Sequence, residues 1–174
     1  MSLDEIRDYL LYDCAGGVFT WIRSPGGGVK VGDVAGCPNA LGYRQIQFRG
    51  HNYLGHQLAW FFVFGIWPTH DIDHRDGVPG HDWITNLRPA THAQNLANAK
   101  LSKANKSGFR GVCFESYTQR WLASLKHEGW HLNLGRFRTP DDAARAYDDA
   151  ARKLKGEFAR LNYPDKPRLS PLGL

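Results

Sequence analysis

The stretch that decides the fold runs from residue 71 to residue 95 and reads DIDHRDGVPGHDWITNLRPATHAQN. It offers Asp73 and His74 at the end of a short strand-like run, then Asn86, and finally Asn95 on a following helix. Neighbouring strand residues point to opposite sides, so Asp73 and His74 diverge, and one can bind a cation while the other faces a reacting water. Carboxylate and amide oxygens are hard ligands suited to magnesium or manganese. The stretch therefore combines cation ligands with a candidate proton acceptor.

The sequence before this stretch predicts small strands packed on an apolar helix. Apolar residues in 2–11 have the spacing of a short amphipathic helix, 18–22 is a strand-like run, and 43–54 alternates and turns as a hairpin would. A further helix over 56–64 is apolar on nearly every side and is stopped by Gly65, so we expect it to lie in the core.

The next helix should begin at Thr91, whose hydroxyl can cap it, and run toward Ala104. It merges into the polar and basic segment 101–107, which has the composition of a linker. We therefore expect a first domain over 1–100, with its motif core at 53–100, and a second domain after the linker.

Beyond the linker, the sequence predicts a three-stranded antiparallel sheet. Strand-like runs at 109–114, 120–126 and 130–136 are separated by turn residues. The dipeptide Glu128-Gly129 should join the last two runs as a tight hairpin turn.

A helix with clear end signals follows these strands. Thr139 supplies an N-cap hydroxyl, Pro140 occupies the first helical position, and Gly156 can end the helix. The second domain then spans 108–163, a tail follows at 164–174, and the whole chain falls in the α+β class. The apolar stripe that should cover the back of the sheet consists of Ala143, Ala144, Tyr147, Ala150, Ala151 and Leu154.

The net charge of +5 is unevenly distributed. Residues 1–100 hold eight Lys/Arg against nine Asp/Glu, whereas 101–174 hold fourteen against eight, so the two parts carry −1 and +6. A basic excess of this kind suits a module that binds a polyanion, although a merely solvated basic surface would show it too.

Composition also argues against some protein classes. No apolar run approaches the roughly 20 residues of a membrane helix, and the start of the chain lacks the pattern of a signal peptide. The three cysteines, Cys14, Cys37 and Cys113, form no C-x-x-C pair, which argues against a disulfide framework or a cysteine-rich zinc site. We therefore expect an intracellular protein with no membrane partner.

The motif core resembles the HNH nuclease family, in the His-Asn-Asn variant found in phage and intron-encoded homing endonucleases. His74, Asn86 and Asn95 match the three motif positions. The flanking runs 55–60 and 72–77 match the family pattern as well, so several spacings agree within one segment.

This resemblance implies a metal site built from two strands and a helix, in which Asp73 and Asn95 hold one Mg²⁺ or Mn²⁺. His74 would be the general base and Asn86 would position the reacting groups. The products would carry a 5′-phosphate and a 3′-hydroxyl. One catalytic set per chain implies that a monomer nicks DNA, whereas a double-strand break needs a dimer assembled on DNA or two separate events.

Four nearby residues each allow two interpretations. His56 matches a family position but is more simply explained as a structural histidine. His81 could contact a phosphate or have no role. Arg75 and Arg88 could bind phosphate beside the site or form ordinary surface ion pairs.

The segment 107–163 resembles the Apetala-type DNA-binding domain of plant ethylene-response factors. The matching runs are 107–112, 120–123, 134–137, 143–148 and 161–162. The resemblance implies a three-stranded sheet that is backed by one helix and enters the major groove of DNA, and this fold agrees with the periodicity. By position, the residues that would contact DNA are Arg110, Cys113, Glu115, Ser124, Lys126, His131 and Asn133. The plant domains carry arginines and tryptophans at several of these positions, so their target sequence should not carry over; the alternative is a small protein-interaction sheet.

Taken together, these observations predict a metal-dependent endonuclease of the homing or phage type that acts on double-stranded DNA. A phage-encoded protein would work in the host cytoplasm. The alternative is a sequence-specific DNA-binding regulator with an inactive nuclease module. A zinc hydrolase is disfavoured, because the chain has neither a helical His-x-x-x-His pair nor paired cysteines.

Overall fold

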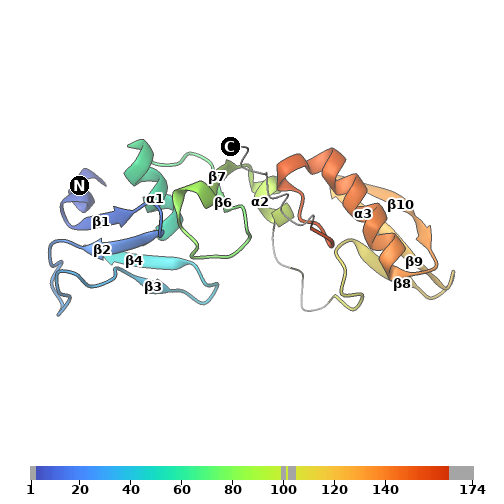
Figure 1. The fold of residues 1–174 in the computed structure, drawn as a ribbon, viewed down its shortest axis with the longest axis horizontal. Helices are drawn as coiled ribbons and strands as arrows, with labels where there is room; N and C mark the ends of the chain where they lie inside the picture. Colours follow the sequence, from blue (N-terminus) through green and yellow to red (C-terminus); the bar gives the residue numbers. More distant parts are fainter. Residues whose placement is uncertain (1–2, 99–100, 102–104, 165–174) are drawn as a thin grey trace, which may run out of the picture. The chain divides into compact units, whose positions relative to one another are not determined.

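Two sets of strands and helices make up the chain (Figure 1), and the computed structural model describes residues 3–98, 101 and 105–164. One unit comprises residues 1–95 and the other residues 96–174. Strands and helices are both present in each unit, which confirms the α+β class. Within the expected linker and tail, 102–104 and 165–174 lie outside the described residues.

The first unit starts with a 3₁₀ helix, η1 (Leu3–Asp8), and continues directly into strand β1 (Leu10–Asp13). β1 pairs antiparallel with β2 (Val18–Trp21). The expectation of a helix over 2–11 is therefore wrong at its end. Leu10 is buried and Leu11 is 59% exposed, which is the alternation of a strand, and pairing with β2 satisfies backbone groups that a short isolated helix would leave open.

A second antiparallel sheet has the order β3 (Cys37–Pro38), β4 (Arg44–Phe48), β5 (His51–Leu54). The hairpin expected over 43–54 is confirmed. Its turn contains only Arg49 and Gly50, with φ angles of 47° and 81°, so the strands resume at His51. Positive φ at both central residues matches the right-handed twist of the flanking strands.

Helix α1 (Gly55–Phe64) follows β5 without a break and ends at Gly65, whose φ is 75°. Leu58, Ala59 and Phe61 are buried against the strands, so one face of α1 is core as expected. The last turn leaves the core, because Phe64 is 50% exposed.

Two further strands and a short helix complete the first unit. β6 (Asp71–His74) pairs antiparallel with β7 (Leu87–Ala90), and η2 (Ile84–Asn86) precedes β7. α2 (His92–Asn98) follows, and its expected extension toward Ala104 passes beyond the described helix. Thr91 caps α2: its Oγ accepts from Gln94 N at 3.3 Å, while its own N donates to Gln94 Oε1 at 2.8 Å.

The second unit is the expected antiparallel sheet, with strand order β10 (Trp130–Phe137), β9 (Arg120–His127), β8 (Val112–Glu115). Glu128 and Gly129 form the tight turn between β9 and β10, with φ angles of 48° and 84°. α3 (Pro140–Lys155) packs on all three strands, and η3 (Gly156–Phe158) follows it.

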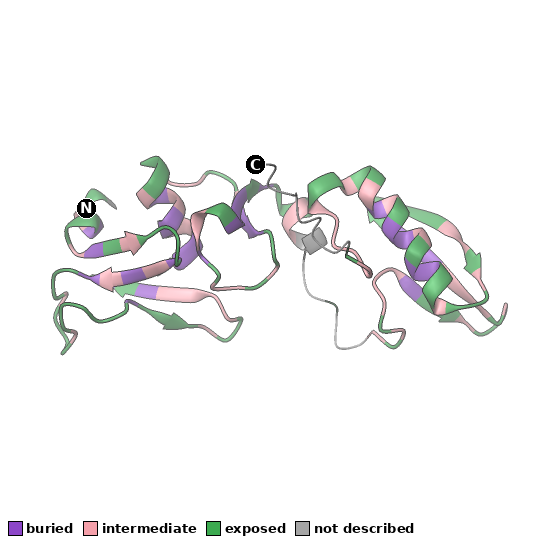
Figure 2. Cartoon of the chain, in the orientation of Figure 1, coloured by how far each residue is buried: buried purple, intermediate pink, exposed green. Residues whose placement is uncertain are grey.

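The ends of α3 confirm the sequence signals. Thr139 Oγ1 accepts from Asp142 N at 3.1 Å, Pro140 opens the helix and Gly156 follows its last residue. Buried residues, coloured purple in Figure 2, recur along α3, and Ala143, Ala144, Tyr147 and Ala151 are among them. The expected apolar stripe is wrong at Leu154, which is 40% exposed.

Candidate active site

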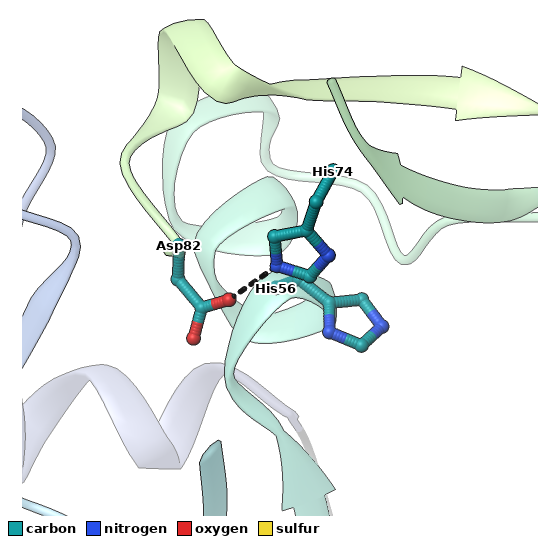
Figure 3. Close-up of side chains that lie close together, drawn as sticks. All are labelled: His56, His74 and Asp82. Atoms are coloured by element: carbon teal, nitrogen blue, oxygen red, sulfur yellow. Dashed lines mark hydrogen bonds and ion pairs between the residues drawn. The ribbon is translucent and has the colours of Figure 1, made fainter. Parts of the chain in front are cut away.

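Three polar side chains from separate elements meet in the interior of the first unit (Figure 3). His56 is the second residue of α1, His74 is the last residue of β6, and Asp82 lies in the loop before η2. His74 Nε2 lies 2.8 Å from Asp82 Oδ1, and their side chains are 5% and 0% exposed. The His56 and His74 rings meet edge to face, with centroids 5.1 Å apart.

Glycine and tyrosine residues hold Asp82 in place. A Cβ on Gly17, whose φ is 68°, would overlap the backbone of Asp82 and Trp83, so glycine is required there, and the Asp82 carboxylate fills the space that a Cβ on Gly55 would need. Tyr12 Oη donates to the Asp82 carbonyl at 2.6 Å. Burial, reinforced by the Asp82 carboxylate, raises the pKa of Tyr12 well above its usual range, so the phenol stays protonated and remains a donor.

His56 is neutral at physiological pH. Burial, with a smaller contribution from His74, lowers the pKa of His56 to about 4. Its Nδ1 and Asp82 Oδ2 are buried and have no hydrogen-bond partner among the described protein atoms. Ligand atoms of His56, His74 and Asp82 all lie within 4.8 Å of one another, so this buried group could hold a metal ion.

Asp73 occupies the opposite face of β6. Its Oδ2 accepts from Arg88 Nε at 2.9 Å and lies 2.8 Å from Arg88 Nη2. Both side chains are 4% exposed, and the two residues are cross-strand partners. Arg88 is therefore part of a buried ion pair, which corrects the expectation of a surface ion pair; its contact with phosphate stays a prediction.

Asn95 lies beside a carboxylate that the sequence analysis missed. Its Nδ2 donates to Asp71 Oδ2 at 3.3 Å, and His92 Nδ1 lies 3.2 Å from the same oxygen. Hydrogen bonds from Asn95 and then His92 lower the pKa of Asp71. Strand alternation is the signal that could have found Asp71, because residues two apart on β6 share a face, so Asp71 and Asp73 both lie on the side away from His74.

Asn86 organises the loop that carries Asp82. Its Nδ2 donates to the His81 carbonyl at 2.8 Å and to Asp76 Oδ1 at 3.1 Å, while its Oδ1 accepts from Asp76 N at 3.2 Å. Burial disfavours the charged form of Asp76, yet hydrogen bonds from His81, Val78 and Asn86 together lower its pKa. His81 is exposed and pairs with Asp76 at 2.7 Å, and Arg75 is exposed at the end of β6.

The predicted DNA-contacting positions gather on the open face of the second unit, opposite α3. Ala123 and Leu125 are buried under α3, so the alternate residues Ser124 and Lys126 point the other way. Their cross-strand partners are Asn133 and His131. Cys113 and Glu115 share this face, as partners of Leu122 and Arg120 on β9.

Arg110 lies just before β8 and is half-buried, and burial lowers the pKa of its guanidinium. Asn162 anchors its backbone: Arg110 N donates to Asn162 Oδ1 at 2.6 Å, and Asn162 Nδ2 donates to the Arg110 carbonyl at 3.1 Å. The structure therefore places Arg110 beside the sheet rather than within its strand register.

A β-bulge adds Arg136 to the open face, although strict alternation would turn this residue toward α3. The register shifts between Asn133 and Gly135, whose φ of 124° favours glycine. Arg136 Nε lies 2.6 Å from Glu115 Oε2, and Arg136 Nη2 lies 3.0 Å from Tyr117 Oη. These contacts lower the pKa of Glu115 and raise that of Arg136.

The chain is similar to two groups of known proteins. The family described as HNH endonuclease matches residues 53–97. Protein 3.8 of Escherichia phage T7 is 35% identical over 92 residues, which cover 52% of this chain and 74% of the phage protein.

Plant transcription factors are similar as well. The ethylene-responsive transcription factor ERN3 of Medicago truncatula is 35% identical over 86 residues, covering 47% of this chain and 36% of that protein. The AP2-like ethylene-responsive transcription factor TOE2 of Arabidopsis thaliana is 41% identical over 106 residues, covering 55% of this chain and 21% of that protein. The chain thus matches less than half of either plant protein. Among its described residues, no helix has the length and apolar character needed to cross a membrane. The chain belongs to the family of phage protein 3.8, with an HNH endonuclease domain at residues 53–97 and a region homologous to AP2/ERF-type transcription factors.

Proposed function

We propose that the chain is a divalent-metal-dependent endonuclease that nicks double-stranded DNA and binds it through the second unit. The observation that carries this proposal is the position of His74 within the matched HNH segment, where a buried carboxylate holds its imidazole at the end of β6. A histidine held in this way can take a proton from water in a hydrolysis.

The face of β6 away from His74 supplies the ligands in this proposal. Asp71, Asp73 and Asn95 offer carboxylate and amide oxygens, the donor set that Mg²⁺ and Mn²⁺ prefer. Asp73 and Asn95 would hold the ion, with Asp71 beside them, and Arg88 holds the Asp73 carboxylate in place. A bound ion would stabilise negative charge on the phosphate and on the leaving oxygen.

The protein residues account for the proton transfer. His74 takes a proton from water, the water oxygen forms a bond to phosphorus, and the bond from phosphorus to the 3′ oxygen breaks. The 3′ oxygen then takes up a proton, which leaves a 3′-hydroxyl and a 5′-phosphate. His74 is only 5% exposed, so it acts on a water admitted to the site rather than on bulk solvent. Asn86 fixes the loop that carries Asp82.

The second unit would supply affinity for DNA through its open face. This face presents Lys126, His131 and Arg136, and the chain from residue 101 onward carries most of the basic excess. Basic side chains on a sheet can neutralise phosphates and release counterions. We propose the same face for base contacts, through Cys113, Ser124 and Asn133, with Arg75 as a phosphate contact of the first unit.

Incubation of supercoiled plasmid with the purified chain tests the proposal. Nicked circles should form with Mg²⁺ or Mn²⁺ and not with EDTA, and His74→Ala should lower the rate by at least about 10²-fold. His51→Ala, which removes an exposed histidine on β5, is the matched control and should keep the rate. Nicking that persists in EDTA or in His74→Ala would contradict the proposal. DNA binding without any nicking would indicate the alternative function, a DNA-binding regulator.

A further inference from the structure

We infer that Asp82 is the positioning residue for His74, so that the active centre contains a buried carboxylate–imidazole pair. The inference rests on the proposed role of His74 as the general base. Asp82 is buried, and its carboxylate forms its hydrogen bond with His74 rather than with the expected metal ligands. Asp82 therefore acts through the ring of His74.

The first argument is the geometry of the pair. The distance of 2.8 Å between His74 Nε2 and Asp82 Oδ1 is that of a strong hydrogen bond. A carboxylate only accepts, so the proton of neutral His74 lies on Nε2, and the lone pair that takes a further proton lies on Nδ1. Asp82 thereby selects one tautomer and one ring orientation. Once His74 has taken a proton from water, the Asp82 carboxylate faces the imidazolium and stabilises it.

The second argument is that Asp82 cannot move aside. Its carboxylate packs against Gly55, the first residue of α1, its backbone packs against Gly17, and Tyr12 donates a hydrogen bond to its carbonyl. A rigid acceptor holds the His74 ring in a single orientation, and that is the requirement for a positioning residue.

The third argument concerns His56, the remaining member of the buried group. Burial keeps His56 neutral, and its ring packs edge to face against His74. Within the group of three, the direct hydrogen bond of Asp82 is with His74. The Asp82 carboxylate therefore stabilises the positive charge that develops on His74 during proton transfer.

A metal ion bound by the same three residues is the competing explanation, because His56 Nδ1 and Asp82 Oδ2 are buried without partners among the described protein atoms. Two ligands of one tetrahedral ion, each about 2.0–2.1 Å from it, stand roughly 3.3 Å apart. His74 Nε2 and Asp82 Oδ1 are closer, at 2.8 Å, which is a direct hydrogen bond. The geometry therefore favours positioning over ligation.

The experiment compares Asp82→Asn, His74→Ala and the wild type as full-length chains. Asp82→Asn keeps the shape of the side chain but removes its charge, and its amide can rotate to donate instead of accept. We expect kcat for nicking to fall about 10–100-fold with KM unchanged. Asp13→Asn is the matched control, because it removes a carboxylate at an exposed position of the same unit and should leave kcat unchanged.

A spectroscopic readout separates positioning from a loss of folding. In the wild type labelled with ¹⁵N-histidine at pH 8, the His74 signal, assigned with His74→Ala, should show the Nε2–H tautomer. In Asp82→Asn the Nδ1–H tautomer should appear. The wild-type spectrum tests the inference even if the variant fails to fold, because an Nδ1–H tautomer there would overturn it.

The remaining outcomes distinguish this inference from the proposed function. An active His74→Ala would overturn the proposed function itself. An inactive His74→Ala beside a fully active Asp82→Asn would overturn only the role of Asp82. A loss of Mn²⁺ affinity in Asp82→Asn, measured by calorimetry without DNA, would show that Asp82 is a ligand and would also overturn the inference; unchanged affinity supports it.

Discussion

The two units place their polar side chains in opposite ways. Within the described part of the chain, the first unit buries His56, Asp73, His74, Asp82, Asn86 and Arg88, whereas the second buries Asp148 alone among polar and charged residues. The polar residues of the second unit instead line its open sheet face. Burying polar groups lowers the stability of a fold unless the groups are paired. A unit that keeps buried polar groups is typical of a catalytic site, whereas a unit with polar groups on an exposed sheet face is typical of a binding module.

Asp148 shows that the exception in the second unit is structural. Its carboxylate accepts from the backbone N of Asn162 and of Tyr163, both at 2.8 Å, and so ties the segment after η3 to α3. Asn162 in turn holds the backbone of Arg110 beside the sheet. This buried carboxylate joins elements of the fold, and no reactive histidine lies against it among the contacts described.

The largest expected effect is on the buried ion pair of the first unit. Arg88→Ala removes the guanidinium that pairs with the buried Asp73 carboxylate, which should cost about 3–5 kcal/mol of folding free energy. Native-state hydrogen exchange at amides of β6 and β7 measures this loss, and amides of β9 serve as the internal control. Protection that is unchanged in β6 would show that the pair contributes little.

The second expected effect is a pH dependence confined to the first unit. The unfolded chain protonates His56 below its ordinary pKa of 6.5, whereas in the folded chain this pKa is about 4. The unfolded state therefore binds more protons between these values, and the first unit should lose up to about 3 kcal/mol as the pH falls from 6.5 to 4. Hydrogen exchange of α1 across this range measures the slope, which His56→Gln should reduce. An equal slope in the wild type and in His56→Gln would show that other groups cause the pH dependence.

A smaller effect is expected for DNA binding by the second unit. Lys126→Ala removes an exposed cation from the open face and should weaken binding a few-fold, with the slope of log affinity against log salt reduced by about 1. Fluorescence anisotropy with duplex DNA measures both values. Lys153→Ala, on the exposed side of α3, is the matched control. Equal losses in both variants would show that binding is not confined to the open face.

The smallest effect is expected for the exposed ion pair of the second unit. Arg136→Ala breaks the contact with Glu115, yet solvent screens the pair, so the folding free energy should change much less than in Arg88→Ala. Native-state hydrogen exchange at amides of β9 measures this change, which is then compared with the change that Arg88→Ala causes at amides of β6 and β7. A cost as large as that of Arg88→Ala would remove the contrast between a buried and an exposed pair.

Local signals in the sequence were sufficient to predict most helices and strands of both units. Thr139 and Gly156 bound α3, and Glu128 and Gly129 close the last hairpin, because caps and tight turns depend on a few adjacent residues. Such signals failed for Leu10 and Leu11, where a helical spacing was overridden by pairing with β2. They also failed for Arg136, since a bulge reverses strand alternation.

The sequence by itself determined the α+β class, because periodicity and end signals indicate the elements of both units; the roles of His74, Asn86 and Asn95 come from the resemblance to the HNH family and stay a prediction. Only the tertiary structure decided that Asp82 meets His74 and that Arg88 is buried against Asp73. Contacts of this kind depend on how a loop folds back and which strand face is covered. The path of the loop and the covered face of the strand are set by burial and pairing energies of the whole unit, so the residue types alone do not determine these contacts.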